Sequence, residues 1–144
     1  HLQHYALGLE MVDCETATRA ECLQRVAARS QNTPPGEWIR GHGWNQNAWV
    51  DGSGDADELD RAAPHNPVYL THKSLHSAWA NHAALNLAGL SPTSPDPAGG
   101  RLGRAPDGNL DGLLYESAME LVAGMIPQPG VAKVTQALRR ALSR

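Results

Sequence analysis

Residues 38–44, Trp-Ile-Arg-Gly-His-Gly-Trp, and residues 68–72, Val-Tyr-Leu-Thr-His, are the two stretches that decide the fold. Both carry the β-branched and aromatic side chains that favour short, buried strands. Gly41 and Gly43 in the first stretch indicate a place where another backbone segment or a ligand approaches closely. We therefore predict a strand at each of these two positions.

Helix-forming segments alternate with these strands. A brief strand is expected at 10–14, and the sequence Thr-Arg-Ala-Glu at 18–21 is a capping box that begins a helix. Apolar residues follow it at spacings of three and four, as one face of a helix requires. A second capping box, Asp-Ala-Asp-Glu at 55–58, begins a short helix that ends near Ala63. Strands that alternate with helices predict an α/β fold.

The second half of the chain departs from this alternation. We predict a helix from Ser77 to Ala88, with Gly89 as its stop. Two strands at 101–105 and 110–114 flank Pro-Asp-Gly-Asn, which is a strong hairpin signal. We assign residues 91–114 to a loop and hairpin insertion within a single unit, 1–144, and expect helices at 116–126 and 131–143.

Composition limits the classes of protein to which this chain can belong. Its 144 residues are 41% hydrophobic, which is enough for one domain with a core. Because the chain has no Phe, its four Trp must help to fill the interior. A net charge of −3 gives no electrostatic footprint for nucleic acid. No apolar run approaches the roughly 20 residues that span a membrane. Cys14 and Cys22 lack metal-site spacing, so we expect free thiols and a cytoplasmic location.

Seven histidines raise the question of a metal site. His72 and His76 flank the end of a predicted strand, where α/β proteins usually build their sites. The sequence contains neither His-Glu-x-x-His nor a Cys/His quartet, so a self-contained zinc site is unsupported. A structural or solvent-facing role stays open for each histidine, His82 included.

Five short strings occur in a fixed order along the chain. They are Pro-Gly-Glu-Trp-Ile-Arg-Gly-His-Gly-Trp-Asn-Gln at 35–46, Leu-Asp at 59–60, Asn-Pro-Val-Tyr-Leu-Thr at 66–71, His-Ser-Ala-Trp-Ala-Asn-His-Ala-Ala-Leu at 76–85, and Gly-Arg-Ala-Pro-Asp-Gly-Asn-Leu-Asp-Gly-Leu-Leu-Tyr-Glu at 103–116. In this order they resemble the amidohydrolase 3 family, which includes N-substituted formamide deformylases. The resemblance covers essentially the whole chain.

The resemblance implies a fold and an activity. Family members are (β/α)8 barrels with a small accessory β domain, and they bind one or two divalent metals at the carboxyl-terminal mouth of the barrel. We therefore expect an α/β, helix-rich segment of such a barrel with a β-hairpin insertion. The protein containing it would hydrolyse amide or formamide C–N bonds of a small molecule with a metal-activated water, and zinc is the metal that we expect.

The resemblance also implies roles for individual residues. His1 matches the second histidine of a metal-binding His-x-His pair. We therefore expect a fragment that begins inside this motif and is inactive alone. Such a fragment need not bind a metal ion itself. Glu116 is a candidate carboxylate at or near the metal, and a charge at a helix N-terminus is its alternative role. The expected substrate-side wall consists of Trp44, Asn45, His76, Trp79 and Asn81.

Two alternatives stay open at this point. Core packing is the competing role for both Trp residues of the expected wall, since the chain has no Phe. For the chain as a whole, the alternative is a stand-alone α/β module that binds a small ligand or a protein without catalysis. A structural insertion with no site of its own is a third possibility.

The fragment hypothesis predicts self-association into homo-oligomers. Strands meant for a closed barrel would expose unpaired edges, and such edges pair with other chains. Sedimentation velocity over a range of concentrations should show growth beyond the monomer. A compact, stable monomer at high concentration would contradict the prediction.

Overall fold

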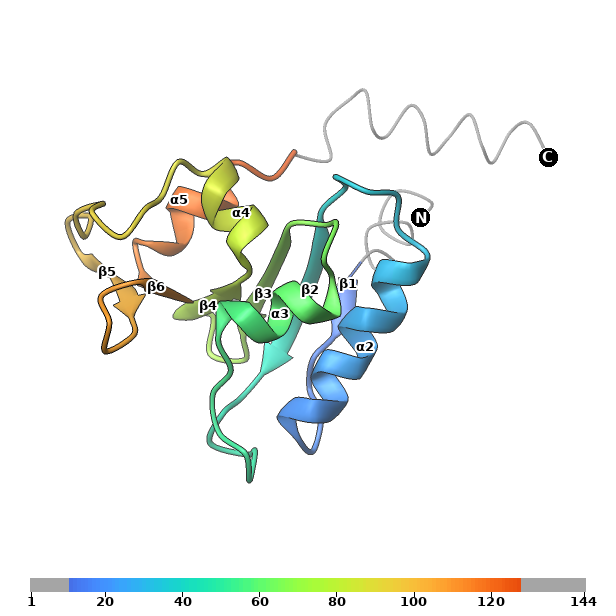
Figure 1. The fold of residues 1–144 in the computed structure, drawn as a ribbon. Coiled ribbons are helices and arrows are strands. Elements are labelled where there is room, and N and C mark those ends of the chain that lie inside the picture. Colours follow the sequence, from blue (N-terminus) through green and yellow to red (C-terminus); the bar gives the residue numbers. More distant parts are fainter. Residues whose placement is uncertain (1–10, 128–144) are drawn as a thin grey trace, which may run out of the picture.

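One six-stranded sheet organises the structure, a computed structural model that describes residues 11–127 (Figure 1). The strand order is β1-β2-β3-β4-β6-β5, with β1, β2 and β3 parallel and the remaining pairs antiparallel. The strands are β1 (Met11–Asp13), β2 (Ile39–Trp44), β3 (Val68–His72), β4 (Ser77–Ala80), β5 (Gly100–Arg104) and β6 (Leu110–Glu116). The helices are α2 (Arg19–Gln31), α3 (Ala56–Ala62), α4 (His82–Leu87) and α5 (Met119–Ala123).

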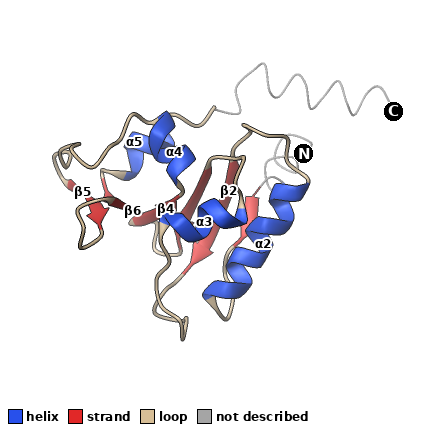
Figure 2. Cartoon of the chain, in the orientation of Figure 1, coloured by secondary structure: helices blue, strands red, loops and turns tan. Residues whose placement is uncertain are grey.

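The parallel half of the sheet confirms the predicted alternation. Helix α2 connects β1 to β2, and α3 connects β2 to β3, and both helices lie on the same face of the strands (Figure 2). Cys22 and Val26 of α2 and Leu59 of α3 pack there against Ile39 and Leu70 of the sheet. The fold is therefore mixed α/β, although strands occupy about as much of residues 11–127 as helices do, so the helix-rich expectation is wrong for this part.

The two predicted capping boxes differ in the structure. At α3 the box is complete, because Asp55 accepts from the Glu58 backbone and the Glu58 carboxylate accepts from the Asp55 backbone. At α2, Thr18 Oγ1 accepts from Glu21 N at 3.1 Å. The Glu21 carboxylate, however, pairs with Arg25 one turn further along. At α2, only the Thr18 half of the capping box is therefore formed.

The helix predicted from Ser77 to Ala88 is a strand followed by a short helix. Residues 77–80 form β4, which pairs with β3 on one side and β6 on the other. The Asn81 side chain then caps α4 by accepting from Ala84 N at 3.1 Å. Pairing on both edges of β4 and burial of Trp79 outweigh the helix propensity of the alanines around it.

The predicted hairpin is confirmed and extended. Strands β5 and β6 pair around the Pro-Asp-Gly-Asn turn, where Ala105 N donates to Asn109 O at 2.8 Å. Strand β6 runs on to Glu116, so the helix expected at 116–126 is shorter and becomes α5. Because β6 also pairs with β4, the hairpin continues the main sheet.

The remaining expectations concern buried residues and segments outside the described range. Cys14 and Cys22 are free and buried, as predicted. A hydrogen bond with the Cys22 side chain raises the pKa of the Cys14 thiol, and burial raises it further. No helix within residues 11–127 is both long and apolar enough to cross a membrane. His1 and the helix predicted at 131–143 lie outside the described residues.

Close approach at Gly41 explains why the first decisive stretch carries glycine. A Cβ atom at this position would lie 2.6 Å from Leu70 Cδ2 and 2.8 Å from Cys14 Sγ. The missing side chain therefore lets β2 sit between its two parallel neighbours while α2 packs on the same face.

Two glycines of the hairpin provide a matched stability test. Gly108 and Gly112 have similar left-handed backbones, with φ of +89° and +95°. A Cβ at Gly108 would meet nothing within 4 Å, whereas one at Gly112 would lie 2.4 Å from Ala80 O. Gly108→Ala should cost about 1–2 kcal/mol from backbone strain alone, and Gly112→Ala should cost about 1–3 kcal/mol more.

Urea unfolding of both variants measures this difference. Equal losses in the two variants would show that β4 and β6 do not pack as closely as described.

Candidate functional site

Polar side chains gather where the parallel strands end. Glu15 follows β1, Asn45 and Gln46 follow β2, and β3 ends at His72. Side-chain contacts join these groups: Glu15 pairs with Lys73 of the β3–β4 turn, and His72 at the end of β3 contacts Gln46 of the loop after β2. We call this region the strand-end site, and it comprises Glu15, Asn45, Gln46, His72, Lys73, His76 and Glu116.

Three indole rings lie beneath the strand-end site. The ring centroids of Trp44, Trp49 and Trp79 are 6.0 to 6.3 Å apart, and the three side chains are buried. Each indole N–H also donates to a backbone carbonyl, at Leu70 O, Thr16 O and Asp55 O respectively. Aromatic rings contribute most to packing when their polar atom is satisfied in this way. The cluster thus connects β3 to the two loops that follow β1 and β2.

A bulge places Trp44 in this cluster. Alternation along β2 would put His42 and Trp44 on one face, but the register with β3 shifts between them. Gly43 lies at the shift, with φ of +105°. Trp44 therefore joins the core, as Trp79 does, in agreement with the packing role left open from sequence. A contact of either indole with substrate stays a prediction.

His72 is held on three sides. Its Nε2 lies 2.9 Å from Gln46 Oε1, and its Nδ1 lies 2.8 Å from Ser74 Oγ. The imidazole also meets the Trp44 ring edge-on, at 4.6 Å between centroids. Burial, and secondarily the charge of His42, lower the pKa of His72 below its ordinary value. The structure therefore favours a neutral imidazole at the end of β3.

A polar row crosses the sheet face opposite α2 and α3. Asp13, His42 and Thr71 are register partners on β1, β2 and β3. His42 Nδ1 lies 2.7 Å from Thr71 Oγ1, which also donates to Gly41 O at 3.3 Å. The side chains of His42 and Thr71 thus form a hydrogen-bonded pair next to the strand-end site, with Asp13 as the register partner of His42 on β1.

His76 and Glu116 form an exposed pair across β4 and β6. His76 Nδ1 lies 3.3 Å from Glu116 Oε2, and Glu116 N donates to His76 O at 2.9 Å. Glu116 has φ of +53°, a left-handed backbone that is unusual for this residue type. The acidic residue in the first turn of α5 is Glu120, so the alternative role of Glu116 as a helix-terminus charge is wrong. Glu116 faces His76 instead.

The two asparagines of the expected wall are engaged differently. Asn81 is buried, and its side chain bonds Val68 N, Ala84 N and Asn66 O, at 2.7 to 3.1 Å. These bonds join β3, α4 and the preceding turn. Asn45 is half-buried, and its Oδ1 accepts from Asn47 N at 3.0 Å. Substrate contact stays a prediction for both.

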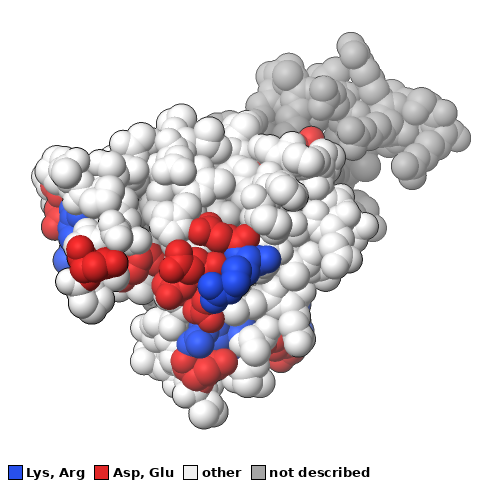
Figure 3. Space-filling view, viewed as in Figure 1, with Lys and Arg blue, Asp and Glu red and all other residues white. Residues whose placement is uncertain are grey.

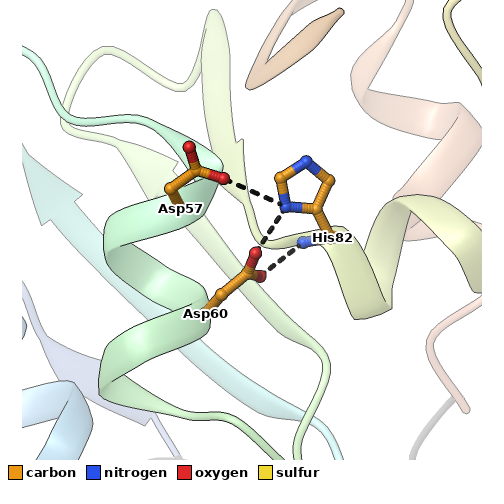
Figure 4. A group of neighbouring side chains, drawn as sticks. All are labelled: Asp57, Asp60 and His82. Carbon is orange, nitrogen blue, oxygen red and sulfur yellow. Dashed lines mark hydrogen bonds and ion pairs between the residues drawn. The ribbon is translucent and has the colours of Figure 1, made fainter.

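Within residues 11–127, three potential metal-ligand atoms come within 4.8 Å of one another in one place, which is not the strand-end site. The group consists of Asp57 and Asp60 of α3 and His82 of α4 (Figure 4). The sequence alone did not predict this group, because Asp57 belongs there to a capping box and His82 to the interior of a predicted helix. The spacing of the aspartates, i and i+3 on a helix, was the available signal.

The chain is similar to known proteins along most of its length. A family model described as "Amidohydrolase family" matches residues 1–144. The Arabidopsis thaliana protein LONG AFTER FAR-RED 3 is 35% identical over 98% of this chain and 25% of its own length. The N-substituted formamide deformylase of Arthrobacter pascens is 36% identical over 85% of this chain and 23% of its own length. The chain thus spans about a quarter of the length of these relatives.

A solved structure shares the fold. The crystal structure of an uncharacterized metal-dependent hydrolase from Pyrococcus horikoshii OT3 superposes with a TM-score of 0.64. The two chains are 24% identical, and the match covers 99% of this chain and 27% of that one.

The lowered pKa of His72 predicts a pH dependence of stability. The unfolded state, with a His pKa near 6.5, binds a proton at a pH where the folded state does not. The stability that neutral His72 contributes to the fold is therefore complete above the unfolded pKa. It is lost as the pH falls through the lower pKa of the folded state. Urea unfolding from about pH 7.5 to about pH 5.5 should show a smaller loss of stability in His72→Gln than in the unsubstituted chain.

His65→Gln is the matched control, because His65 is an exposed turn residue. If His72→Gln and His65→Gln gave the same pH profile, His72 would not be held in its neutral form.

Proposed function

The chain belongs to the amidohydrolase family, and we propose that it supplies the substrate-side wall of a metal-dependent hydrolase. The proposed reaction is hydrolysis of an amide- or formamide-type C–N bond in a small molecule. The names of the Arthrobacter deformylase and the Pyrococcus hydrolase support this assignment. The two buried free thiols support the cytoplasmic location that we also propose.

The observation that carries the proposal is the position of the strand-end site. Its polar groups follow the carboxyl-terminal ends of three parallel strands. Barrels and open α/β sheets place ligands at this end, because the loops there converge from several strands. Residues on these loops can therefore reach a common substrate.

The same strands support the proposal of a partial (β/α)8 barrel. The order β1-α2-β2-α3-β3 repeats a strand and a helix, with the helices on one face. The row of Asp13, His42 and Thr71 lies on the opposite face, which would become the interior of a closed barrel. Strand β1 is an edge of the described sheet, where a further strand could pair.

The described strand-end residues do not by themselves fit the catalytic metal that the family implies. Three potential ligand atoms do not converge there within residues 11–127, and both ring nitrogens of His72 are engaged by neighbouring side chains. We therefore assign no metal-dependent step to these residues. His1, outside the described range, stays the proposed ligand, and zinc stays the proposed ion.

His76 and Asn45 are the residues proposed to meet the substrate, and Glu116 is proposed to orient the His76 ring. The Glu116 carboxylate can only accept, so its contact with Nδ1 assigns the proton to that nitrogen and leaves Nε2 as an acceptor when His76 is neutral. An acceptor at this position suits the N–H of a substrate amide. The half-buried Asn45 amide offers a donor for the carbonyl oxygen.

Kinetics of the protein encoded by the complete reading frame test the proposal. Hydrolysis of an N-substituted formamide should be measured for the unsubstituted protein and for His76→Phe and Glu116→Gln. We expect kcat/KM to fall about 10- to 100-fold in His76→Phe, because the substrate N–H loses its hydrogen-bond acceptor. A smaller fall is expected in Glu116→Gln, since only the orientation of the imidazole changes.

His65→Phe is the control, because His65 is exposed and lies in the turn before β3, at the amino-terminal end of that strand. Unchanged kinetics in His76→Phe, or an equal loss in His65→Phe, would count against the assigned wall. If the complete protein hydrolysed no C–N bond of this type, the reaction itself would be refuted.

A further inference from the structure

The junction of α3 and α4 carries three side chains that the proposed function does not use. Asp57 and Asp60 lie three residues apart on α3 and therefore share a face of the helix. His82 is the first residue of α4, and its Nδ1 lies 2.5 Å from Asp60 Oδ2 and 3.6 Å from Asp57 Oδ1 (Figure 4). Two carboxylates thus face a single imidazole nitrogen.

The backbone around these side chains is fixed by independent contacts. The complete capping box of Asp55 and Glu58 begins α3, and the buried Asn81 side chain caps α4. Asp60 Oδ1 also accepts from His82 N at 2.9 Å, which ties the two helices together. A site built on fixed helix ends has its donor atoms in place before a ligand arrives.

The geometry points to a binding site for a divalent transition-metal ion at Asp57, Asp60 and His82. Two ligand atoms on one tetrahedral zinc ion lie roughly 3.2–3.6 Å apart, because each bond is about 2.0–2.2 Å long. The separation of Asp57 Oδ1 from His82 Nδ1 agrees with this spacing. Asp60 and His82 are closer, as expected when a shared proton occupies the position of the ion.

The donor set determines which ions fit. One imidazole and two carboxylates suit zinc, cobalt and similar ions, whereas magnesium and calcium prefer oxygen ligands alone. Binding requires a free lone pair on Nδ1 of His82, which a neutral imidazole offers when its proton is on Nε2.

An adjacent pocket supplies a second, independent observation. A cavity of about 230 Å³ opens beside the three side chains, and Asp57 and His82 line it. Asp107 and Asp111 of the β5–β6 hairpin line its other side, and none of its lining residues is Lys or Arg. Figure 3 shows acidic side chains gathered over α3 on this face of the molecule, beside basic ones. The negative lining favours cations, and the cavity leaves room for the water that would complete the coordination.

Metal titration of the 144-residue chain tests the inference. Isothermal titration with zinc chloride, and visible absorption of added Co²⁺, should show one site that weakens at least tenfold in His82→Gln and in Asp57→Asn. Asp57 is largely exposed, with 69% of its side chain accessible, so its substitution should leave the fold intact. Circular dichroism of each variant verifies this.

His76→Gln is the matched control, since it removes another exposed histidine that also faces a carboxylate. Unchanged binding in His76→Gln, together with weakened binding in Asp57→Asn, would support the site. No binding by the unsubstituted chain, or equal affinities in the unsubstituted chain and Asp57→Asn, would overturn it and leave an ion pair between His82 and Asp60. The result is independent of the hydrolase activity, because neither readout requires turnover.

Discussion

Contact among three indole rings is the constraint on which the strand-end site depends. Trp44, Trp49 and Trp79 come from β2, the loop after β2, and β4, and their N–H groups donate to carbonyls of β3 and of the loops after β1 and β2. With no Phe in the chain, these rings provide the largest volumes in the core beneath the parallel strands. Because they combine packing with directed hydrogen bonds, they fix loops that would otherwise move independently.

The bulge at Gly43 connects this core to the chemistry above it. Since the register shift turns Trp44 toward the helices, the ring can meet His72 edge-on, and His72 can bond Gln46 and Ser74. The same region passes through the β3–β4 turn to His76 and Glu116. The site is therefore a chain of contacts that starts in the core and ends at exposed groups, a pattern suited to holding substrate in a fixed orientation.

Sequence was sufficient where local signals and tertiary structure agree. The strand at 68–72 and the hairpin turn at 106–109 were predicted correctly, since strand propensity and turn chemistry both favour the observed structure. Residues 77–80 were assigned to a helix, because alanines favour helices and only pairing with β3 and β6 makes them a strand. The site at Asp57, Asp60 and His82 was missed for a related reason. Its ligands become neighbours only after α3 and α4 pack.

We propose that the ends of the parallel strands form the wall that contacts substrate. The most direct test is a crystal structure of the protein encoded by the complete reading frame, with a non-hydrolysable formamide analogue bound. We expect the analogue to lie against the strand-end site, within hydrogen-bonding distance of His76 and Asn45. An analogue bound at the opposite, amino-terminal ends of β1, β2 and β3, with the strand-end site facing solvent, would contradict it.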